Sequence, residues 1–301
     1  MILVLGGTGR LGRETVKLLA TSGTHEVRVL VRENANAAAF TGTSVEILTG
    51  ETTDENSLTH AMHDVDRVFT IPPNVRDQAE MENRIYQAAR RAGVDYIVKL
   101  STTKANVNSP CYFFKQHAIA EECLKASGVR FTILRSNSFM QNLLWFANEI
   151  KSNSTFSLPM DVAKTAPVDI RDVAAVASAI LTGESHHGAT YNISGPEKLS
   201  FADIAQRLSA ATGKQIEYRD IAPAEFLSML IGAGMPGWYA EAVTASWTVS
   251  RQDEPILTNV VSALTQKPPI TFEQFARDHA NQLTPQKPQK TPKRVSGRSK
   301  F

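Results

Sequence analysis

A glycine-rich segment near the N-terminus constrains the fold of this chain more than any other feature. It reads Gly6-Gly7-Thr8-Gly9-Arg10-Leu11-Gly12, follows the apolar run 2–5 and precedes a helix predicted over 10–21. Glycines at this spacing permit a tight turn, close approach of backbone N–H groups to a pyrophosphate, and close packing of helix on strand. The positive end of the helix dipole would then face an anion. The segment therefore predicts a nucleotide-binding site, and a tight structural turn is the alternative.

Short apolar runs alternate with helical patterns over the first half of the chain. We expect strands at 2–5, 26–31, 45–48, 67–71, 96–100 and 130–134, and helices at 10–21, 55–62, 77–92 and 112–127. Near-continuous apolar strands separated by helices are typical of a parallel sheet covered on both faces, with right-handed crossovers. The predicted fold class is therefore α/β, a Rossmann-type doubly wound parallel sheet with a smaller, mostly helical C-terminal lobe.

The end of the second expected strand bears on the choice of cofactor. Arg32 follows this strand, where an NAD site usually places an acid on the ribose 2′-hydroxyl. An arginine suits the 2′-phosphate of NADP instead, and Arg10 could close on the same phosphate. Glu33 comes next and could point at the ribose, so NAD stays an alternative cofactor. Arg32 could also be a solvent-exposed loop residue with no role in binding. We expect NADP, with NAD as the less favoured cofactor.

The chain carries an almost balanced charge that is unevenly distributed. The formal net charge is +2, yet residues 284–301 hold six basic side chains and no acidic one, which leaves −4 for the rest. A body of this charge does not favour a dedicated nucleic-acid binder. The proline-rich tail has too few apolar residues to bury a core, so we expect it to be disordered. Tethering of the tail to nucleic acid or an acidic membrane is an alternative for that segment alone.

Cysteine content and hydropathy bear on the compartment. The chain has two cysteines, no run of 18 apolar residues, and an apolar strand at its start in place of a charged leader. These features predict a cytoplasmic protein with no membrane span and no disulfide framework. His60 and His63 stand three apart with no further ligands near them, so no metal site is expected.

The helical and strand patterns also suggest a division into domains. We expect an NAD(P)-binding Rossmann domain over 1–155, with 164–195 returning to it because a further strand is expected at 190–193. Helical stretches after Gly195-Pro196 predict a substrate-covering lobe over 196–282. A disordered basic tail over 283–301 completes the expected organisation.

Several further motifs resemble those of a known family. They include Val98-Lys99-Leu100-Ser101-Thr102, Ser194-Gly195-Pro196-Glu197, and parts of 50–58, 65–73, 127–142 and 167–174. Over residues 1–282 the chain thereby resembles the NmrA-like family of atypical short-chain dehydrogenases/reductases. That family includes NADPH-dependent quinone reductases, triphenylmethane-dye reductases and cofactor-sensing regulators.

The resemblance implies where the cofactor lies. The nicotinamide would sit near the ends of the fourth and fifth strands, with Thr70, Ile71 and Pro72 on one side and Ser101 and Thr102 on the other. For Ile71 and Pro72, a simple strand end is an equal alternative. The family often has Gly-Asp after the third strand, near the adenine. This chain has Glu51 there, one methylene longer.

A general acid of the usual kind is missing. Typical short-chain reductases carry Tyr-x-x-x-Lys, and none of the six tyrosines has a lysine four residues on. The resemblance places His117 at the lysine position and Phe113 at the tyrosine position. With Glu121 they share one helix face, so Glu121 is expected to orient His117 or raise its pKa. The alternative is a helix histidine that is simply bonded to Glu121.

The expected chemistry follows from this difference. A positioned general acid contributes roughly 10²–10⁴ in rate, so a reductase without one suits quinones, conjugated carbonyls and iminium-type acceptors. The substrate would lie between the sheet's carboxyl edge and the lobe, near Phe113, Phe139, Asn142 and Trp145. We therefore expect an NAD(P)H-dependent oxidoreductase acting on a small molecule, in which His117 donates a proton or holds the substrate. The rival is a non-catalytic NADP(H)-sensing regulator acting through a protein partner.

Overall fold

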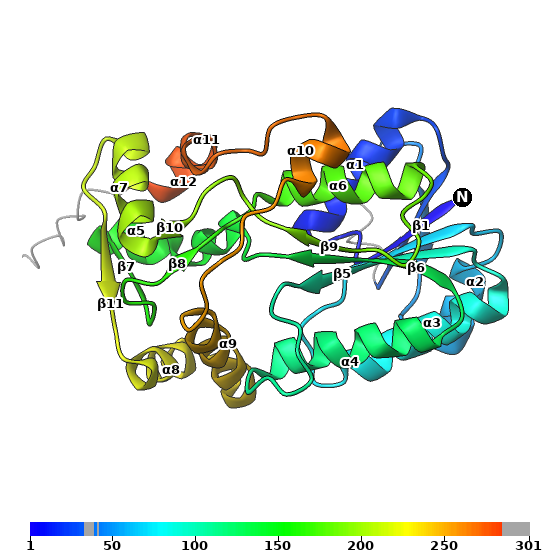
Figure 1. The fold of residues 1–301 in the computed structure, drawn as a ribbon, viewed down its shortest axis with the longest axis horizontal. Helices are drawn as coiled ribbons and strands as arrows, with labels where there is room; N and C mark the ends of the chain where they lie inside the picture. Colours follow the sequence, from blue (N-terminus) through cyan, green and yellow to red (C-terminus); the bar gives the residue numbers. More distant parts are fainter. Residues whose placement is uncertain (33–38, 41, 285–301) are drawn as a thin grey trace, which may run out of the picture.

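A seven-stranded parallel sheet forms the centre of the molecule in this computed structural model, which describes residues 1–32, 39–40 and 42–284 (Figure 1). The strand order is β3-β2-β1-β4-β5-β6-β9. The bounds are β1 Ile2–Leu5, β2 Val27–Val31, β3 Glu46–Thr49, β4 Arg67–Thr70, β5 Tyr96–Thr102, β6 Arg130–Ser136 and β9 Thr190–Ile193. The order reverses between β1 and β4, which is where open α/β sheets bind ligands. The expected doubly wound fold is confirmed.

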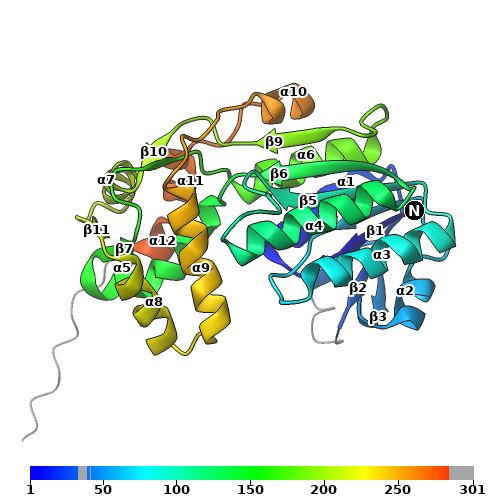
Figure 2. The ribbon, with the colours of Figure 1, turned by 60° about the horizontal axis from the view of Figure 1, so that its bottom comes forward.

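Helices cover both faces of this sheet. Figures 1 and 2 show α1 (Arg10–Ser22) and α6 (Ile170–Thr182) on one face and α2 (Glu55–Ala61), α3 (Gln78–Ala92) and α4 (Tyr112–Ala126) on the other. Along β1, Ile2 and Val4 join the core on the first face, while Leu3 and Leu5 join the core on the second. Because both faces are buried, the central strands carry apolar residues on both faces rather than at alternate positions, with buried Arg28 and Lys99 as charged exceptions.

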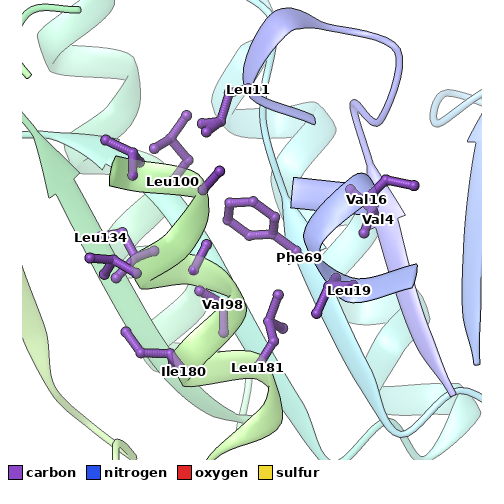
Figure 3. Packing of buried hydrophobic residues seen from close by; sticks show 14 of the residues in the cluster. Val4, Leu11, Val16, Leu19, Phe69, Val98, Leu100, Leu134, Ile180 and Leu181 are labelled. Atoms are coloured by element: carbon purple, nitrogen blue, oxygen red, sulfur yellow. The ribbon is translucent and has the colours of Figure 1, made fainter. Parts of the chain in front are cut away.

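The core beneath α1 anchors the glycine-rich turn. Phe69 of β4 is fully buried, and Figure 3 shows its ring between α1 and α6. Leu11, in the first turn of α1, packs into the same cluster with Leu100 of β5. The start of α1 is therefore fixed against the ends of the central strands.

A second lobe lies beside the carboxyl edge of the sheet. Its helices are η2 (Met140–Phe146), α5 (Ala147–Asn153), α7 (Phe201–Thr212), α8 (Pro223–Gly232), α9 (Gly237–Ser250), α11 (Phe272–Asp278) and α12 (Ala280–Leu283). Its strands are β7 (Thr155–Leu158), which pairs in parallel with β11 (Glu217–Asp220), and β8 (Lys164–Thr165), which pairs antiparallel with β10 (Leu199–Ser200).

The lobe core draws on residues from both sides of the boundary expected near 155. Met140, Ile150 and Phe156 are buried in one cluster with Phe201 and Phe226. Conversely, α10 (Val260–Thr265) packs against α6 at the sheet. The chain therefore passes between the two cores several times, and one cut in the sequence does not separate them.

The boundary expected at residue 283 between the folded body and the tail lies too early in the sequence. Leu283 is fully buried at the end of α12, so it belongs to the folded body rather than to a tail over 283–301. Residues 285–301, like Glu33, lie outside the described residues. Among the described residues, no helix is long and apolar enough to cross a membrane.

Candidate functional site

The glycine-rich turn between β1 and α1 is shaped by close backbone packing. Gly6 has φ +86°, and a Cβ placed on it would lie 2.4 Å from the carbonyl oxygen of Ile71. A Cβ on Gly12 would lie 2.3 Å from the carbonyl oxygen of Gly6. Gly9 caps α1 without a side-chain hydrogen bond, and no acid stands in the first turn. This helix N-terminus is left without a capping side chain, an arrangement that fits a phosphate.

Arg10 and Arg13 at this turn donate to backbone carbonyl oxygens, and a third arginine, Arg32, follows β2. Arg10 donates from Nη1 to the carbonyl oxygen of Gln141 at 3.1 Å, so it contacts the lobe at η2. Arg32 is exposed at the end of β2. Arg13, which the sequence reasoning did not select, donates from Nε to the carbonyl oxygen of Thr8 at 2.8 Å. Its place directly after the last glycine was the available clue.

A cavity of about 390 Å³ lies where the sheet edge meets the lobe. The residues of its lining that the sequence singled out are Leu11, Ile71, Pro72, Ser101, Thr102, Phe113, His117, Phe139, Asn142 and Trp145. The lining residues that it missed include Asn74, Lys104, Asn137, Met160, Lys164, Tyr239 and Trp247. The missed residues that belong to the lobe are not part of any local sequence motif. Only the tertiary fold brings them next to the sheet.

The cavity wall combines several aromatic rings with aliphatic and polar side chains. The ring of Phe113 packs against Tyr239, with centroids 5.1 Å apart. Trp145 is 58% exposed, so much of its indole is free for contact with a ligand. Asn142 donates to Ser138 Oγ at 3.4 Å, and Lys164 is exposed. Such a wall suits a flat, conjugated ligand held by a few polar contacts.

The other selected residues lie away from the cavity lining. They are Gly6, Gly7, Thr8, Gly9, Arg10, Gly12, Arg32, Glu51, Thr70 and Glu121. Most of them belong to the glycine-rich turn. Glu51 is exposed after β3 and accepts a hydrogen bond from Thr53 Oγ1 at 3.0 Å. Thr70 is buried at the end of β4.

Glu121 does not bond to His117 as expected. It is buried and accepts from Ser101 Oγ at 2.5 Å and from Arg135 Nε at 3.0 Å, and it forms a second contact with Arg135 through Nη2. Oε1 of Glu121 therefore has partners from both β5 and β6, and Oε2 is paired with Arg135 of β6. A spacing of four residues places His117 and Glu121 on one face of the helix. The Arg135 guanidinium from the neighbouring strand is nevertheless the stronger partner for the Glu121 carboxylate.

His117 instead makes its hydrogen bond to α3. Its Nδ1 lies 3.2 Å from Gln78 Nε2, while the ring also lines the cavity. Burial lowers the pKa of His117 well below its ordinary value, and the nearby charge of Lys99 lowers it further. The expected raising of this pKa by Glu121 is therefore wrong, and the imidazole is neutral at neutral pH.

No group of three or more metal-ligating side chains occurs among the described residues. Cys111 is buried, and burial raises the pKa of its thiol. The chemistry available in the cavity is therefore hydrogen bonding by polar side chains and charge contacts from Lys104 and Lys164, together with what a bound nucleotide would supply.

Comparison with known proteins places these features in a family. Residues 1–276 match the NmrA-like family. The chain is 34% identical over 281 residues to the NAD(P)H azoreductase of Xenophilus azovorans, covering 93% of this chain and 98% of that protein. It is 33% identical over 289 residues to the (4-alkanoyl-5-oxo-2,5-dihydrofuran-3-yl)methyl phosphate reductase of Streptomyces griseus subsp. griseus, covering 95% and 100%. Among solved structures, the NADPH-dependent quinone oxidoreductase of Escherichia coli complexed with NADPH gives a TM-score of 0.82 at 26% identity, covering 92% and 99%.

Proposed function

The chain belongs to the NmrA-like family, and from this premise we propose that it is an NADPH-dependent oxidoreductase that delivers a hydride to a quinone, conjugated carbonyl or iminium-type acceptor. One observation carries the proposal: the glycine-rich turn adjoins the cavity. Leu11 opens α1 at the turn and Ile71 packs on Gly6, and both line the cavity. A dinucleotide bound at the turn would therefore reach the cavity. Each of the three similar proteins named above is a reductase or oxidoreductase by name.

The expected cofactor contacts follow the carboxyl edge of the sheet. The pyrophosphate would bind the N–H groups at the start of α1, and Arg32 would contact the 2′-phosphate. Glu51 would lie near the adenine. The nicotinamide would lie between Ile71 and Pro72 on one side and Ser101 and Thr102 on the other. When bound, NADPH supplies the hydride, and the protein supplies orientation and exclusion of water.

The enzyme would work without a Tyr-x-x-x-Lys pair. Phe113 stands where that tyrosine would be, and it contributes an apolar surface to the cavity. A neutral His117 offers a hydrogen bond to the acceptor rather than a full proton. Phe139, Asn142 and Trp145 would hold the acceptor against the nicotinamide. Glu121 acts indirectly, because it holds Arg135 and Ser101.

An absorbance assay of NADPH oxidation tests the proposal. The purified protein is mixed with NADPH and a panel of quinones, conjugated carbonyls, cationic dyes and azo compounds, with protein-free mixtures as the control. We expect turnover with at least one acceptor class and a preference for NADPH over NADH. Binding of NADPH with no oxidation by any acceptor would instead support a cofactor-sensing regulator.

A further inference from the structure

A stripe of polar side chains is buried on the face of α3 that meets β5 and α4. Gln78, Glu82 and Tyr86 recur at four-residue intervals, which places them along one face of the helix. All three are fully buried, and so is Lys99 of β5, which faces them. Burial of charged groups is costly unless they are paired and hydrogen-bonded. This cluster therefore holds a defined arrangement of partners.

Glu82 is the centre of the cluster. Lys99 Nζ donates to Glu82 Oε2 at 2.6 Å, and the Tyr86 hydroxyl donates to the same oxygen at 2.7 Å. The other oxygen, Oε1, accepts from Gln78 Nε2 at 3.1 Å. With a lysine ammonium beside it, Glu82 is an ionised carboxylate that can only accept hydrogen bonds.

This carboxylate decides which way the Gln78 amide points. The amide oxygen cannot face an ionised carboxylate, because two acceptors would then meet, so the NH₂ group faces Glu82. The same nitrogen lies 3.2 Å from His117 Nδ1. An amide NH₂ has two hydrogens and accepts none, so its second hydrogen is donated to Nδ1. His117 Nδ1 must therefore be the unprotonated nitrogen of the ring.

We propose that Gln78, held by Glu82, is a positioning residue that fixes His117 as the tautomer with hydrogen on Nε2 and so presents a neutral hydrogen-bond donor to the cavity. Within the described residues, His117 Nε2 has no hydrogen-bond partner, while the ring lines the cavity. The donor is thus free for an acceptor oxygen or nitrogen. The catalytic use of this donor rests on the proposed oxidoreductase function, whereas the tautomer does not.

The same arrangement disfavours an imidazolium. Protonation of Nδ1 would set an N–H against the amide NH₂ of Gln78 and break that hydrogen bond. Lys99 adds a positive charge on the same side, and the depressed pKa of His117 agrees with both effects. His117 would therefore stabilise negative charge developing on the acceptor while remaining neutral, as preorganised donors do in other enzymes.

The tautomer can be observed directly by long-range ¹H–¹⁵N correlation NMR on protein labelled with ¹⁵N-histidine. The His117→Asn spectrum identifies the His117 signals among those of the seven histidines. We expect Nε2 to show the shift of a protonated nitrogen and Nδ1 that of an unprotonated one at neutral pH. A protonated Nδ1 in the wild-type protein would overturn the proposal without any variant.

Two substitutions of Gln78 test its role. Gln78→Met removes both donors and should leave a mixture of tautomers. Gln78→Glu places a second carboxyl against Glu82, and two adjacent carboxyls are expected to hold one proton between them. The new side chain would then accept a hydrogen bond from His117, which should move the ring proton to Nδ1. The matched control is Gln116→Met, because the side chain of Gln116 accepts from the N–H of Ala79 at the same helix junction, whereas the hydrogen bond of His117 is made by Gln78. An unchanged His117 tautomer in folded Gln78→Met and Gln78→Glu proteins would refute the role of Gln78.

Activity gives a second readout. Loss of one preorganised donor costs roughly 10²–10³ in kcat, so Gln78→Glu should lower kcat by about that factor while the NADPH Kd and Gln116→Met kinetics stay near wild type. An equal mixture of tautomers in Gln78→Met should lower kcat only about twofold, since about half of the molecules keep the donor. Absence of turnover with the expected NMR tautomer would refute the oxidoreductase function and leave the positioning role of Gln78 standing.

Discussion

Substitution of Gly12 by alanine probes the glycine-rich turn where it is tightest. A Cβ at this position would lie 2.3 Å from the carbonyl oxygen of Gly6, and also 2.7 Å from the Cα of Gly7. Ordinary contact begins near 3.4 Å, so α1 and the turn would have to separate by about 1 Å. Both neighbours are backbone atoms, which cannot rotate away. The added methyl group therefore distorts the surface that we propose for the pyrophosphate.

The size of the effect follows from this geometry. Overpacking of this kind costs roughly 1–3 kcal/mol, which corresponds to about a 5- to 150-fold increase in the NADPH Kd if the turn takes up the strain. Fluorescence titration of NADPH measures this directly. The matched control is Gly237→Ala at the start of α9, where a Cβ would meet no atom within 4 Å. Equal NADPH affinity in folded Gly12→Ala and Gly237→Ala proteins would refute the placement of the cofactor at this turn.

Three further substitutions test other parts of the account. Arg32→Glu should weaken NADPH binding more than NADH binding in parallel titrations, because Arg32 is proposed to contact the 2′-phosphate; unchanged preference would contradict that contact. Glu121→Gln should lower the free energy of unfolding in urea by roughly 1–3 kcal/mol, since it removes the charged partner of the partly exposed Arg135 guanidinium, whereas exposed Glu122→Gln should have little effect. Burial raises the pKa of Asp172 to about 6, so stability should fall as pH rises from roughly 4 to 6. Asp172→Asn should remove that part of the pH dependence in unfolding measurements, and an unchanged profile would show that Asp172 is not its source.

Much of the sheet could be predicted from local pattern. The central strands are buried on both faces, so each reads as an apolar run, and the helices between them show their own periodicity. The lobe was harder. β7 pairs with β11, which follows about sixty residues later, so no local pattern indicates the pairing. The helical segment before β7 divides into η2 and α5.

The site residues could be predicted where the backbone geometry requires a particular residue type. They were harder to predict where a side chain has hydrogen-bond partners from distant parts of the sequence. Glycines at 6 and 12 are required by contacts below 3 Å, and such requirements leave a readable motif. The predicted hydrogen bond between His117 and Glu121 was wrong. Helical spacing placed both side chains on one face of the helix, but spacing could not reveal that Arg135 on β6 pairs with Glu121. The polar stripe of Gln78, Glu82 and Tyr86 was visible as a four-residue repeat. Its burial depends on Lys99, which comes from another strand.

The central claim is that NADPH spans from the glycine-rich turn to the cavity. A crystal structure of the complex with NADP⁺ measures this directly. We predict the pyrophosphate at the N-terminus of α1, the 2′-phosphate at Arg32, and the nicotinamide between Ile71 and Ser101 with its reactive face open to the ring of His117. A nicotinamide bound outside the cavity, or turned away from His117, would contradict the account.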